Sequence, residues 1–363
     1  MKRKRRWTKA WLVILAAIVA LAGCGGPAED PEPEPMPEPE PQVVQTPVEP
    51  EPEPEPEPVY PYVYPLTGIG TEELLEERPL LMLIENHRDA RPQSGLIDAD
   101  IVYEILAEGE ITRFAAVFHS EKPEVIGPIR SLRPYYAQIG EAVDALIVHA
   151  GYSPAALEYV QKKKLDHFDE IYNAGAYFWR SKERKAPHNL YTSTELIRKG
   201  MGDKKVRSEW HAPAAIPFAA KDAVITGETA ETVLVEYYAG YKVEYVYDAG
   251  KGTFLRHMAG SPHLDKESGE QIEAANVMII KTSHRVLDDV GRREVNIYGP
   301  GEGWLVQQGK AREIEWKLVD GLIRPYINGE EVALVPGKTW VQVISPNLKV
   351  TFSAKEGESN TAS

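Results

Sequence analysis

The chain has 363 residues and a formal net charge of −14, from 41 basic and 55 acidic side chains. Eleven of the acidic residues and no basic ones lie in residues 25–58, so the rest of the chain is only mildly acidic. No basic stripe appears along the sequence, which argues against a nucleic-acid-binding protein. Cys24 is the only cysteine, so the folded part has no disulfide and no cysteine nucleophile or metal ligand.

The first nine residues include six basic ones, and an apolar run from Trp11 to Leu21 follows. This run is too short to span a bilayer as a mature helix. It ends in small residues before Cys24 and resembles a bacterial lipoprotein signal. The resemblance implies a signal peptide over residues 1–23 and acyl chains such as palmitate on Cys24. Such chains would anchor the protein on the extracytoplasmic face of the cell membrane. An uncleaved membrane anchor is the alternative.

Residues 24–65 are predicted to form an extended linker. Residues 27–58 alternate proline with glutamate and hold 13 of the 29 prolines. Proline fixes φ and like charges repel, so this segment favours polyproline II rather than a domain. At ~3.1 Å per residue it could reach roughly 100 Å from the membrane. That length suits a module held inside a thick cell wall, although a merely solubilising tether fits equally well.

The remaining chain predicts an α/β fold, a layered mixed-sheet body with its helices mostly in the N-terminal half. We expect an N-terminal α/β domain over residues 66–210 and a β-rich C-terminal domain over residues 211–363. One α/β body with sheets continuous across residue 210 is the alternative. The expected strands and helices of the first half are Leu80–Ile84, Ile101–Glu108, Ile111–Phe118, Pro134–Val143, Ala145–His149, Pro154–Lys164 and a last helix capped by Thr192 or Ser193 and closed by Gly200 or Gly202.

The second half reads as short strands separated by Gly, Asp and Asn turns. The expected strands are Thr232–Tyr238, Lys242–Tyr247, Thr253–Met258, Asn276–Thr282, Glu294–Tyr298, Gly303–Gln308, Arg312–Leu318, Leu322–Ile327, Thr339–Ser345 and Leu348–Phe352.

The hairpin around Gly109 carries the main functional hypothesis. Gly109 and Glu110 have the pattern of a two-residue type II′ loop. The resulting register places Leu106 opposite Arg113. Glu104 and Arg113 would then be diagonal neighbours on one face, close enough to pair.

Several motifs in order resemble one family of proteins. They are Ala90–Leu96 (ARPQSGL), Ala99–Glu104 (ADIVYE), Ile111–Arg113 (ITR), Ile126–Ser131 (IGPIRS), Ala186–Thr192 (APHNLYT) and Pro336–Trp340 (PGKTW). This set is similar to the YerB-like lipoproteins of Gram-positive bacteria over roughly residues 66–352. The resemblance implies stacked α/β layers and two family regions in one chain. It implies no activity, because the family is one of unknown function, and it supplies no catalytic residue.

The candidate binding residues are expected to converge on one cleft. They are Glu104, Arg113, Arg130, Arg133, Asn86 and His188. Arginines beside a helix start can hold a phosphate or carboxylate by forked hydrogen bonds. A structural ion-pair cluster that fastens the hairpin to the helix is the alternative, because ion-pair networks also gather charges.

Motifs for metal, cofactor or nucleophilic chemistry are weak. None of the nine histidines forms an H-E-x-x-H pattern, so neither a metal nor a cofactor is expected. Ser153 lacks the G-x-S-x-G context and suits a helix cap. Gly337–Thr339 resembles the end of a phosphate loop, but a strand follows it instead of a helix.

These observations favour a membrane-anchored, non-catalytic envelope protein that binds a wall polymer or a membrane-bound wall enzyme around Arg113, Arg130 and Arg133. The alternative is an envelope hydrolase or transferase acting on an anionic glycan, with Glu104 as base, so the sequence leaves catalysis open. The surroundings of Glu104 discriminate between them. An open pocket would favour the enzyme, and close pairing on a covered face would favour a scaffold.

Overall fold

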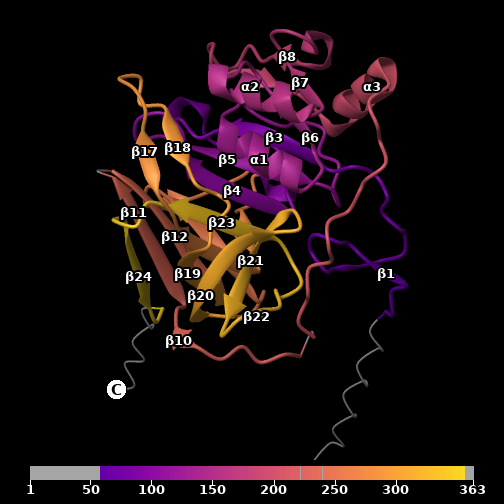
Figure 1. Ribbon diagram of the computed structural model, residues 1–363. Coiled ribbons are helices and arrows are strands. Elements are labelled where there is room, and N and C mark those ends of the chain that lie inside the picture. Colours follow the sequence, from indigo (N-terminus) through magenta and orange to yellow (C-terminus); the bar gives the residue numbers. More distant parts are fainter. Residues whose placement is uncertain (1–57, 221, 239, 356–363) are drawn as a thin grey trace, which may run out of the picture. The chain divides into compact units, whose positions relative to one another are not determined.

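The structure is a computed structural model that describes residues 58–220, 222–238 and 240–355 (Figure 1). The predicted signal peptide, the lipidation site Cys24 and the linker up to residue 57 lie outside the described residues. The described residues all belong to a single compact unit. Among them, no helix combines the length and the apolar character needed to cross a membrane.

A twelve-stranded mixed sheet forms the centre of the fold. Its order is β22 (Glu330–Glu331), β21 (Leu322–Ile327), β20 (Lys310–Val319), β19 (Gly301–Gln307), β16 (Asn276–Lys281), β23 (Thr339–Ile344), β4 (Ile101–Leu106), β5 (Thr112–Phe118), β3 (Leu80–Glu85), β6 (Leu146–His149) and β7 (His167–Asp169), and β10 (Glu228–Thr229) pairs with β20.

A six-stranded antiparallel sheet packs on one face of the large sheet. It contains β14 (Ser261–Pro262), β13 (Thr253–Met258), β12 (Tyr241–Asp248), β11 (Thr232–Tyr238), β24 (Lys349–Ser353) and β15 (Glu273–Ala274). The described residues also form three two-stranded sheets: β1 (Tyr62–Val63) with β2 (Gly70–Thr71), β8 (Trp179–Arg180) with β9 (Leu190–Tyr191), and β17 (His284–Val286) with β18 (Arg293–Val295).

The helices of the described residues lie before residue 210. They are α1 (Pro134–Ala142), α2 (Pro154–Lys163) and α3 (Thr194–Lys204), with short 3₁₀ turns η1 (Arg88–Ala90), η2 (Leu96–Asp98) and η3 (Gly175–Tyr177). Buried side chains of α1 and α2 pack on the face opposite the six-stranded sheet, while those of α3 pack on the same face as that sheet. Mixed sheets with a few helices agree with a mixed α/β class at this coarse level.

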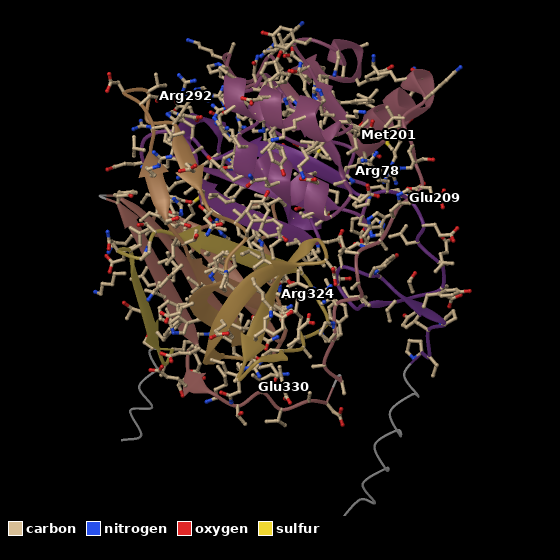
Figure 2. The ribbon with its side chains drawn as sticks, in the orientation of Figure 1. Arg78, Met201, Glu209, Arg292, Arg324 and Glu330 are labelled. Atoms are coloured by element: carbon tan, nitrogen blue, oxygen red, sulfur yellow. The ribbon has the colours of Figure 1, made fainter. Side chains whose placement is uncertain are left out.

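The large sheet is continuous across residue 210. β23 lies between β16 and β4 and runs parallel to both, so Val341 pairs with Tyr103 on one side and with Met278 on the other. The connecting segment after α3 runs along the outside of the sheet (Figure 1). Arg324, labelled in Figure 2, fastens it by donating from Nη1 to the carbonyl of Ala215 at 3.0 Å. The sheet thus joins both halves, and whether each half folds as a domain remains a prediction.

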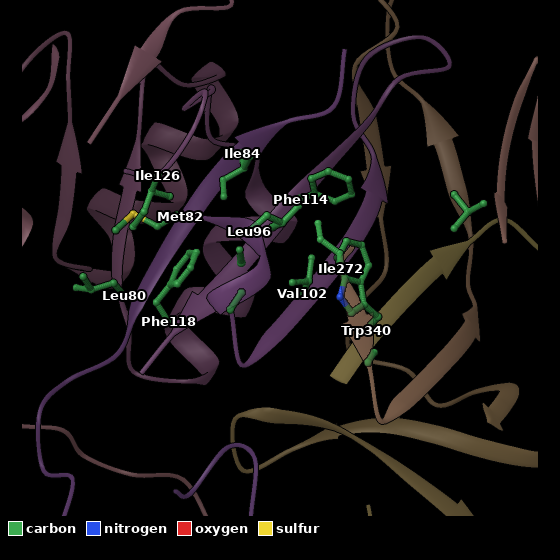
Figure 3. Close-up of a cluster of buried hydrophobic side chains, with 14 of the residues drawn as sticks. Leu80, Met82, Ile84, Leu96, Val102, Phe114, Phe118, Ile126, Ile272 and Trp340 are labelled. Atoms are coloured by element: carbon green, nitrogen blue, oxygen red, sulfur yellow. The ribbon is translucent and has the colours of Figure 1, made fainter. Parts of the chain in front are cut away.

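Burial patterns explain why each sheet sits where it does. Every residue of β3, β4 and β5 is buried, as expected for central strands covered on both faces. β11 alternates buried and half-buried positions, as expected for a sheet with one face in the core. Figure 3 shows a row of core side chains along one face of the large sheet, which includes Phe114 and Trp340.

The hairpin register differs from the prediction by one residue. Ile105 pairs with Arg113, whereas the predicted partner of Arg113 was Leu106. Ile111 N–H donates to the carbonyl of Glu108 at 3.1 Å, and Gly109 has a positive φ of 58° whereas Glu110 does not, as in the predicted two-residue type II′ turn. Ala107 N–H donates to the carbonyl of Ile111 at 2.8 Å, so Ala107 and Glu108 together lie opposite Ile111, as in a β-bulge. The predicted turn residues are therefore correct, and the extra residue beside the turn makes the predicted register wrong.

This shift changes which side chains of the two strands share a face, because side chains alternate along a strand. Glu104 lies opposite Phe114, on the face that meets the six-stranded sheet. Arg113 lies opposite Ile105, on the face that meets α1 and α2. The predicted pairing of Glu104 with Arg113 is therefore wrong.

Candidate functional site

Six strands of the large sheet, β3, β4, β6, β7, β16 and β23, run in the same direction. Their carboxyl ends therefore share one edge of the sheet, where α/β proteins commonly bind ligands. Glu85 ends β3 there, and Arg113 lies near the start of antiparallel β5 at the same edge, since it pairs with Glu85. A binding site is therefore expected at this edge.

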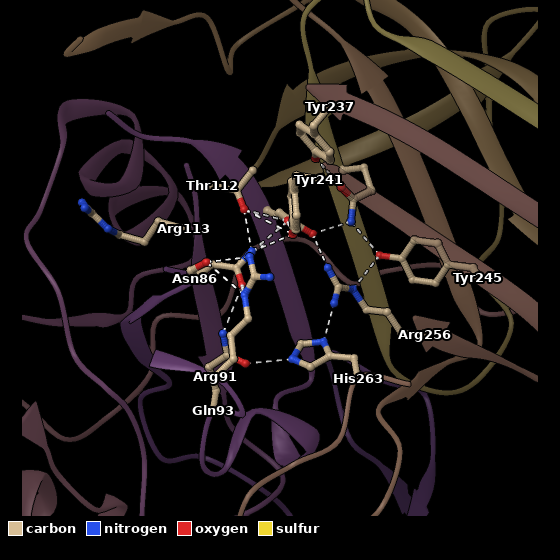
Figure 4. Close-up of polar contacts among 12 residues, drawn as sticks. Asn86, Arg91, Gln93, Thr112, Arg113, Tyr237, Tyr241, Tyr245, Arg256 and His263 are labelled. Atoms are coloured by element: carbon tan, nitrogen blue, oxygen red, sulfur yellow. Dashed lines mark hydrogen bonds and ion pairs between the residues drawn. The ribbon is translucent and has the colours of Figure 1, made fainter. Parts of the chain in front are cut away.

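Glu104 is the centre of a buried polar network between the two sheets. Figure 4 shows this network, with Thr112, Tyr241 and Arg256 among its labelled members. Its Oε2 accepts from Arg256 Nη2 at 2.6 Å and from Gln342 Nε2 at 2.8 Å. Its Oε1 accepts from Thr112 Oγ1 at 2.8 Å and from the Tyr241 hydroxyl at 2.5 Å. Neither Glu104 nor Arg256 has any solvent exposure.

Aromatic side chains enclose the Arg256 guanidinium. It lies 4.3 Å from the ring centre of Trp340 and 5.5 Å from that of Phe114. Burial alone would lower the pKa of Arg256, but the Glu104 carboxylate outweighs it and raises that pKa.

A general base must come within hydrogen-bond reach of its substrate. Glu104 cannot do so in this fold, and it fastens one sheet to the other.

His263 extends the network and stays neutral. Its Nδ1 accepts from Arg256 Nη1, which leaves Nε2–H to donate to Gln93 Oε1 at 2.8 Å. Burial and the charge of Arg256 hold the pKa of His263 well below its ordinary value. A neutral histidine in this tautomer satisfies both neighbours.

Asn86 belongs to the same buried network. Its side-chain amide donates to Thr112 Oγ1 at 2.7 Å and to the Tyr241 hydroxyl at 2.6 Å. Its Oδ1 accepts from Arg91 Nε at 3.0 Å and from Gln93 Nε2 at 3.1 Å. Both the oxygen and the nitrogen of the amide are hydrogen-bonded to neighbouring side chains, and only 1% of the residue is exposed. Asn86 therefore helps to hold the two sheets together.

Arg113 and Arg133 form a separate ion-pair cluster, and Figure 4 shows Arg113 pointing away from the Glu104 network. Arg113 Nη2 lies 2.9 Å from Glu108 Oε2, and Arg133 pairs with Glu108 Oε1. Burial by itself would raise the pKa of Glu108, but the two guanidiniums hold it below its ordinary value. Glu108 stays ionised and bridges the hairpin loop to the start of α1.

Arg130 and His188 meet at Glu85, which is not among the predicted binding residues. Glu85 Oε1 lies 3.1 Å from Arg130 Nε and 3.0 Å from His188 Nδ1. The His188 ring stacks on His87 with centroids 4.7 Å apart. Glu85 is a charged residue at the end of an otherwise apolar strand. This position was the sequence feature that could have marked it as a site residue.

The starts of α1 and α2 lie side by side at this edge. Leu132 N–H donates to the carbonyl of Gly151 at 2.9 Å, and Ser153 N–H donates to the carbonyl of Leu132 at 3.2 Å. Ser153 Oγ accepts from Ala156 N–H at 3.3 Å, so the predicted helix cap is confirmed. We call this region, Arg113, Arg130, Arg133, Glu85, Glu108 and the two helix starts, the arginine edge.

The candidates therefore divide between two places. Glu104 and Asn86 are sealed between the sheets, while Arg113, Arg130, Arg133 and His188 lie along the arginine edge. The prediction that Glu104 and the arginines line one binding cleft is wrong. The three arginines and His188 remain binding candidates.

A large groove in the described residues lies elsewhere and is acidic. It has a volume of about 1040 Å³ and contains none of the six candidates. Its carboxylates are Asp98, Glu124, Asp265, Glu267, Glu270 and Glu273. Lys338, part of the sequence that resembled a phosphate loop, uses its Nζ to donate to the carbonyl of Ile97 at 2.5 Å, which suits a structural role.

The chain belongs to a family of proteins of unknown function. The description "Protein of unknown function (DUF3048) N-terminal domain" matches residues 66–207, and the corresponding C-terminal domain matches residues 233–341. The family membership predicted from the sequence motifs is thereby confirmed.

A relative from Bacillus subtilis, YerB, resembles the chain over most of its length both in sequence and in structure. A protein of strain 168 named "Putative lipoprotein YerB" is 38% identical over 299 residues, which cover 81% of this chain and 89% of that protein. A crystal structure of the YerB protein has a TM-score of 0.74 and 36% identity, and it covers 80% of this chain and 99% of that chain.

Proposed function

We propose that this chain is a membrane-anchored lipoprotein of the cell envelope that binds an anionic wall polymer at the arginine edge without catalysing a reaction. The signal-like segment that ends at Cys24 supports the anchor, as does the description of the relative YerB as a putative lipoprotein. Lipid on Cys24 would place the protein on the outer face of the membrane, and the linker would carry the folded unit into the wall.

The excess of positive charge at the arginine edge carries this proposal. Three guanidiniums share two carboxylates there, those of Glu85 and Glu108. Burial lowers the pKa of Arg130 and of Arg133, and the nearby charge of Arg113 lowers both further. A bound phosphate or carboxylate would relieve this repulsion, and the two adjacent helix starts add partial positive charge.

The buried position of Glu104 supports the non-catalytic form of the proposal. The enzyme alternative depended on Glu104 as a base that substrate can reach, and Glu104 is enclosed and paired with Arg256. Without that base, the alternative has no proposed proton acceptor, whereas anion binding requires only the arginines.

The test is co-sedimentation of the full chain with purified cell walls, before and after their phosphate-bearing polymer is removed. The Arg130→Ala/Arg133→Ala variant should bind the intact walls at least roughly tenfold more weakly, since a charged hydrogen bond contributes about 1.5–3 kcal/mol. Arg285→Ala/Lys349→Ala removes the same charge from exposed ion pairs elsewhere and should bind normally. Equal binding by both folded variants would refute the proposal.

A further inference from the structure

Three potential metal ligands meet beside the arginine edge from two distant segments. His87 and Asp89 flank the start of η1, and His188 comes from the loop before β9. One ligand atom from each residue lies within 4.8 Å of the other two. The histidines are half-buried and Asp89 is exposed, so an ion from solvent can reach them.

The orientation of His188 is the arrangement that metal-binding histidines use. Its Nδ1 lies 3.0 Å from Glu85 Oε1, so Nδ1–H can donate to the carboxylate and leave Nε2 as a free lone pair. A carboxylate in this position fixes the ring and raises its basicity as a ligand. Glu85 is itself 3% exposed, so this support is held rigidly at the end of β3.

An unsatisfied atom also marks this place. Glu85 Oε2 is buried and makes no hydrogen bond to any described residue. Buried carboxylate oxygens normally have partners, and an unpaired one is costly. A positive charge bound beside Glu85 would stabilise this carboxylate.

Two local changes would accompany binding. The His87 and His188 rings stack at an interplanar angle of 16°, and one ion cannot lie in both ring planes while they remain stacked. The His87 side chain is 30% exposed against 18% for His188, so His87 is the ring that turns. The ion must also compete with Arg88, whose Nε lies 3.5 Å from Asp89 Oδ1. Both side chains of this ion pair are exposed, so breaking it costs little free energy.

We propose that His87, Asp89 and His188 bind a divalent transition-metal ion, Zn²⁺ being the best match, with Glu85 as the positioning residue for His188. Two imidazole nitrogens and one carboxylate oxygen form a donor set typical of zinc, and three protein ligands leave a fourth position open. This site shares Glu85 with the arginine edge, but its three ligands are not the arginines that would hold the anion, so either proposal can fail alone.

The test is calorimetric titration of the full chain with zinc chloride, with Cys24→Ser in every variant because a free thiol is itself a zinc ligand. One equivalent should bind. His188→Ala and His87→Ala should each abolish that binding, while His211→Ala, an exposed histidine elsewhere, should not change it. Glu85→Gln should weaken binding roughly 10- to 100-fold, as loss of such a supporting carboxylate does.

Cobalt provides a second readout. Co²⁺ in a tetrahedral site gives strong visible absorption, which should appear in the parent chain and in His211→Ala and be absent from His188→Ala. Weak binding by the acidic linker is common to all variants and gives the background. The proposal is overturned if zinc does not bind above that background, or if the His87→Ala and His188→Ala variants bind it as the parent does.

Discussion

Glu104 and Arg113 show how a single residue of register decides which side chains can meet a ligand. The predicted two-residue turn alone would place both on one face, and the extra residue at Ala107 and Glu108 beside that turn places them on opposite faces. Gly109 marks the turn in the sequence, but nothing in this stretch marks the bulge, so the sequence alone did not reveal it. The residue types of the candidate site were therefore predictable from the sequence, but the grouping of Glu104 with the arginines was not.

The buried pair between Glu104 and Arg256 should dominate local stability. Glu104→Gln leaves the enclosed guanidinium without its counter-charge, which typically costs about 3–5 kcal/mol. Urea unfolding measures this loss. The matched change at an exposed strand position, Glu302→Gln, should cost under about 0.5 kcal/mol. Adding Arg256→Met to Glu104→Gln should recover much of the loss, and a double variant no more stable than the single one would contradict this reading.

Two buried histidines predict a loss of stability in acid. Burial lowers the pKa of His149 to about 3 and that of His119 to about 4. An unfolded histidine titrates near pH ~6.5, so below that pH the unfolded chain binds more protons. Stability should fall as the pH drops from about 6.5 toward 4, by about 1.4 kcal/mol per pH unit for each histidine.

Urea midpoints between pH 7 and pH 4 test that slope. His149→Gln should flatten it, because glutamine does not titrate. His211→Gln, which removes an exposed histidine, should leave it unchanged. An equal slope in the parent and in His149→Gln would show that His149 does not contribute.

For the strands and helices, the local sequence pattern predicted that an element exists better than it predicted where the element ends. β11 has the predicted bounds, Thr232–Tyr238, because alternation and a flanking glycine both mark them. The last helix was expected to close at Gly200 or Gly202, and α3 continues to Lys204. Gly200 is small for packing, since a Cβ there would lie 2.6 Å from Phe168 Cε2. Tertiary contact, which sequence pattern does not reveal, explains that glycine.

The two glycines of α3 therefore make opposite predictions. Gly202→Ala has open space for its Cβ and should stabilise the protein by about 0.5–1 kcal/mol through helix propensity. Gly200→Ala has the same propensity gain but must displace Phe168 and Tyr177, so it should destabilise the protein by about 1–3 kcal/mol. Thermal unfolding of the two variants checks the signs, and the same sign for both would contradict the packing described for α3.

At the scale of the whole molecule, the sequence predicted layered α/β structure but not the order of the strands. β23 comes near the end of the chain and inserts next to β4, from the first half. Such a contact depends on complementary buried faces far apart in sequence, which local periodicity does not encode. The same topology places the carboxyl ends of six strands on one edge, and that is why the arginines of separate motifs gather there.

The central claim is that the arginine edge binds an anion presented by the wall. The most direct measurement is nuclear magnetic resonance of the arginine Nε–H groups while the chain is titrated with a short, soluble, phosphate-bearing fragment of wall polymer. The account predicts that the signals of Arg130 and Arg133 shift and saturate together while that of Arg285 stays fixed. Unchanged signals at Arg130 and Arg133, with the fragment bound elsewhere or not at all, would contradict it.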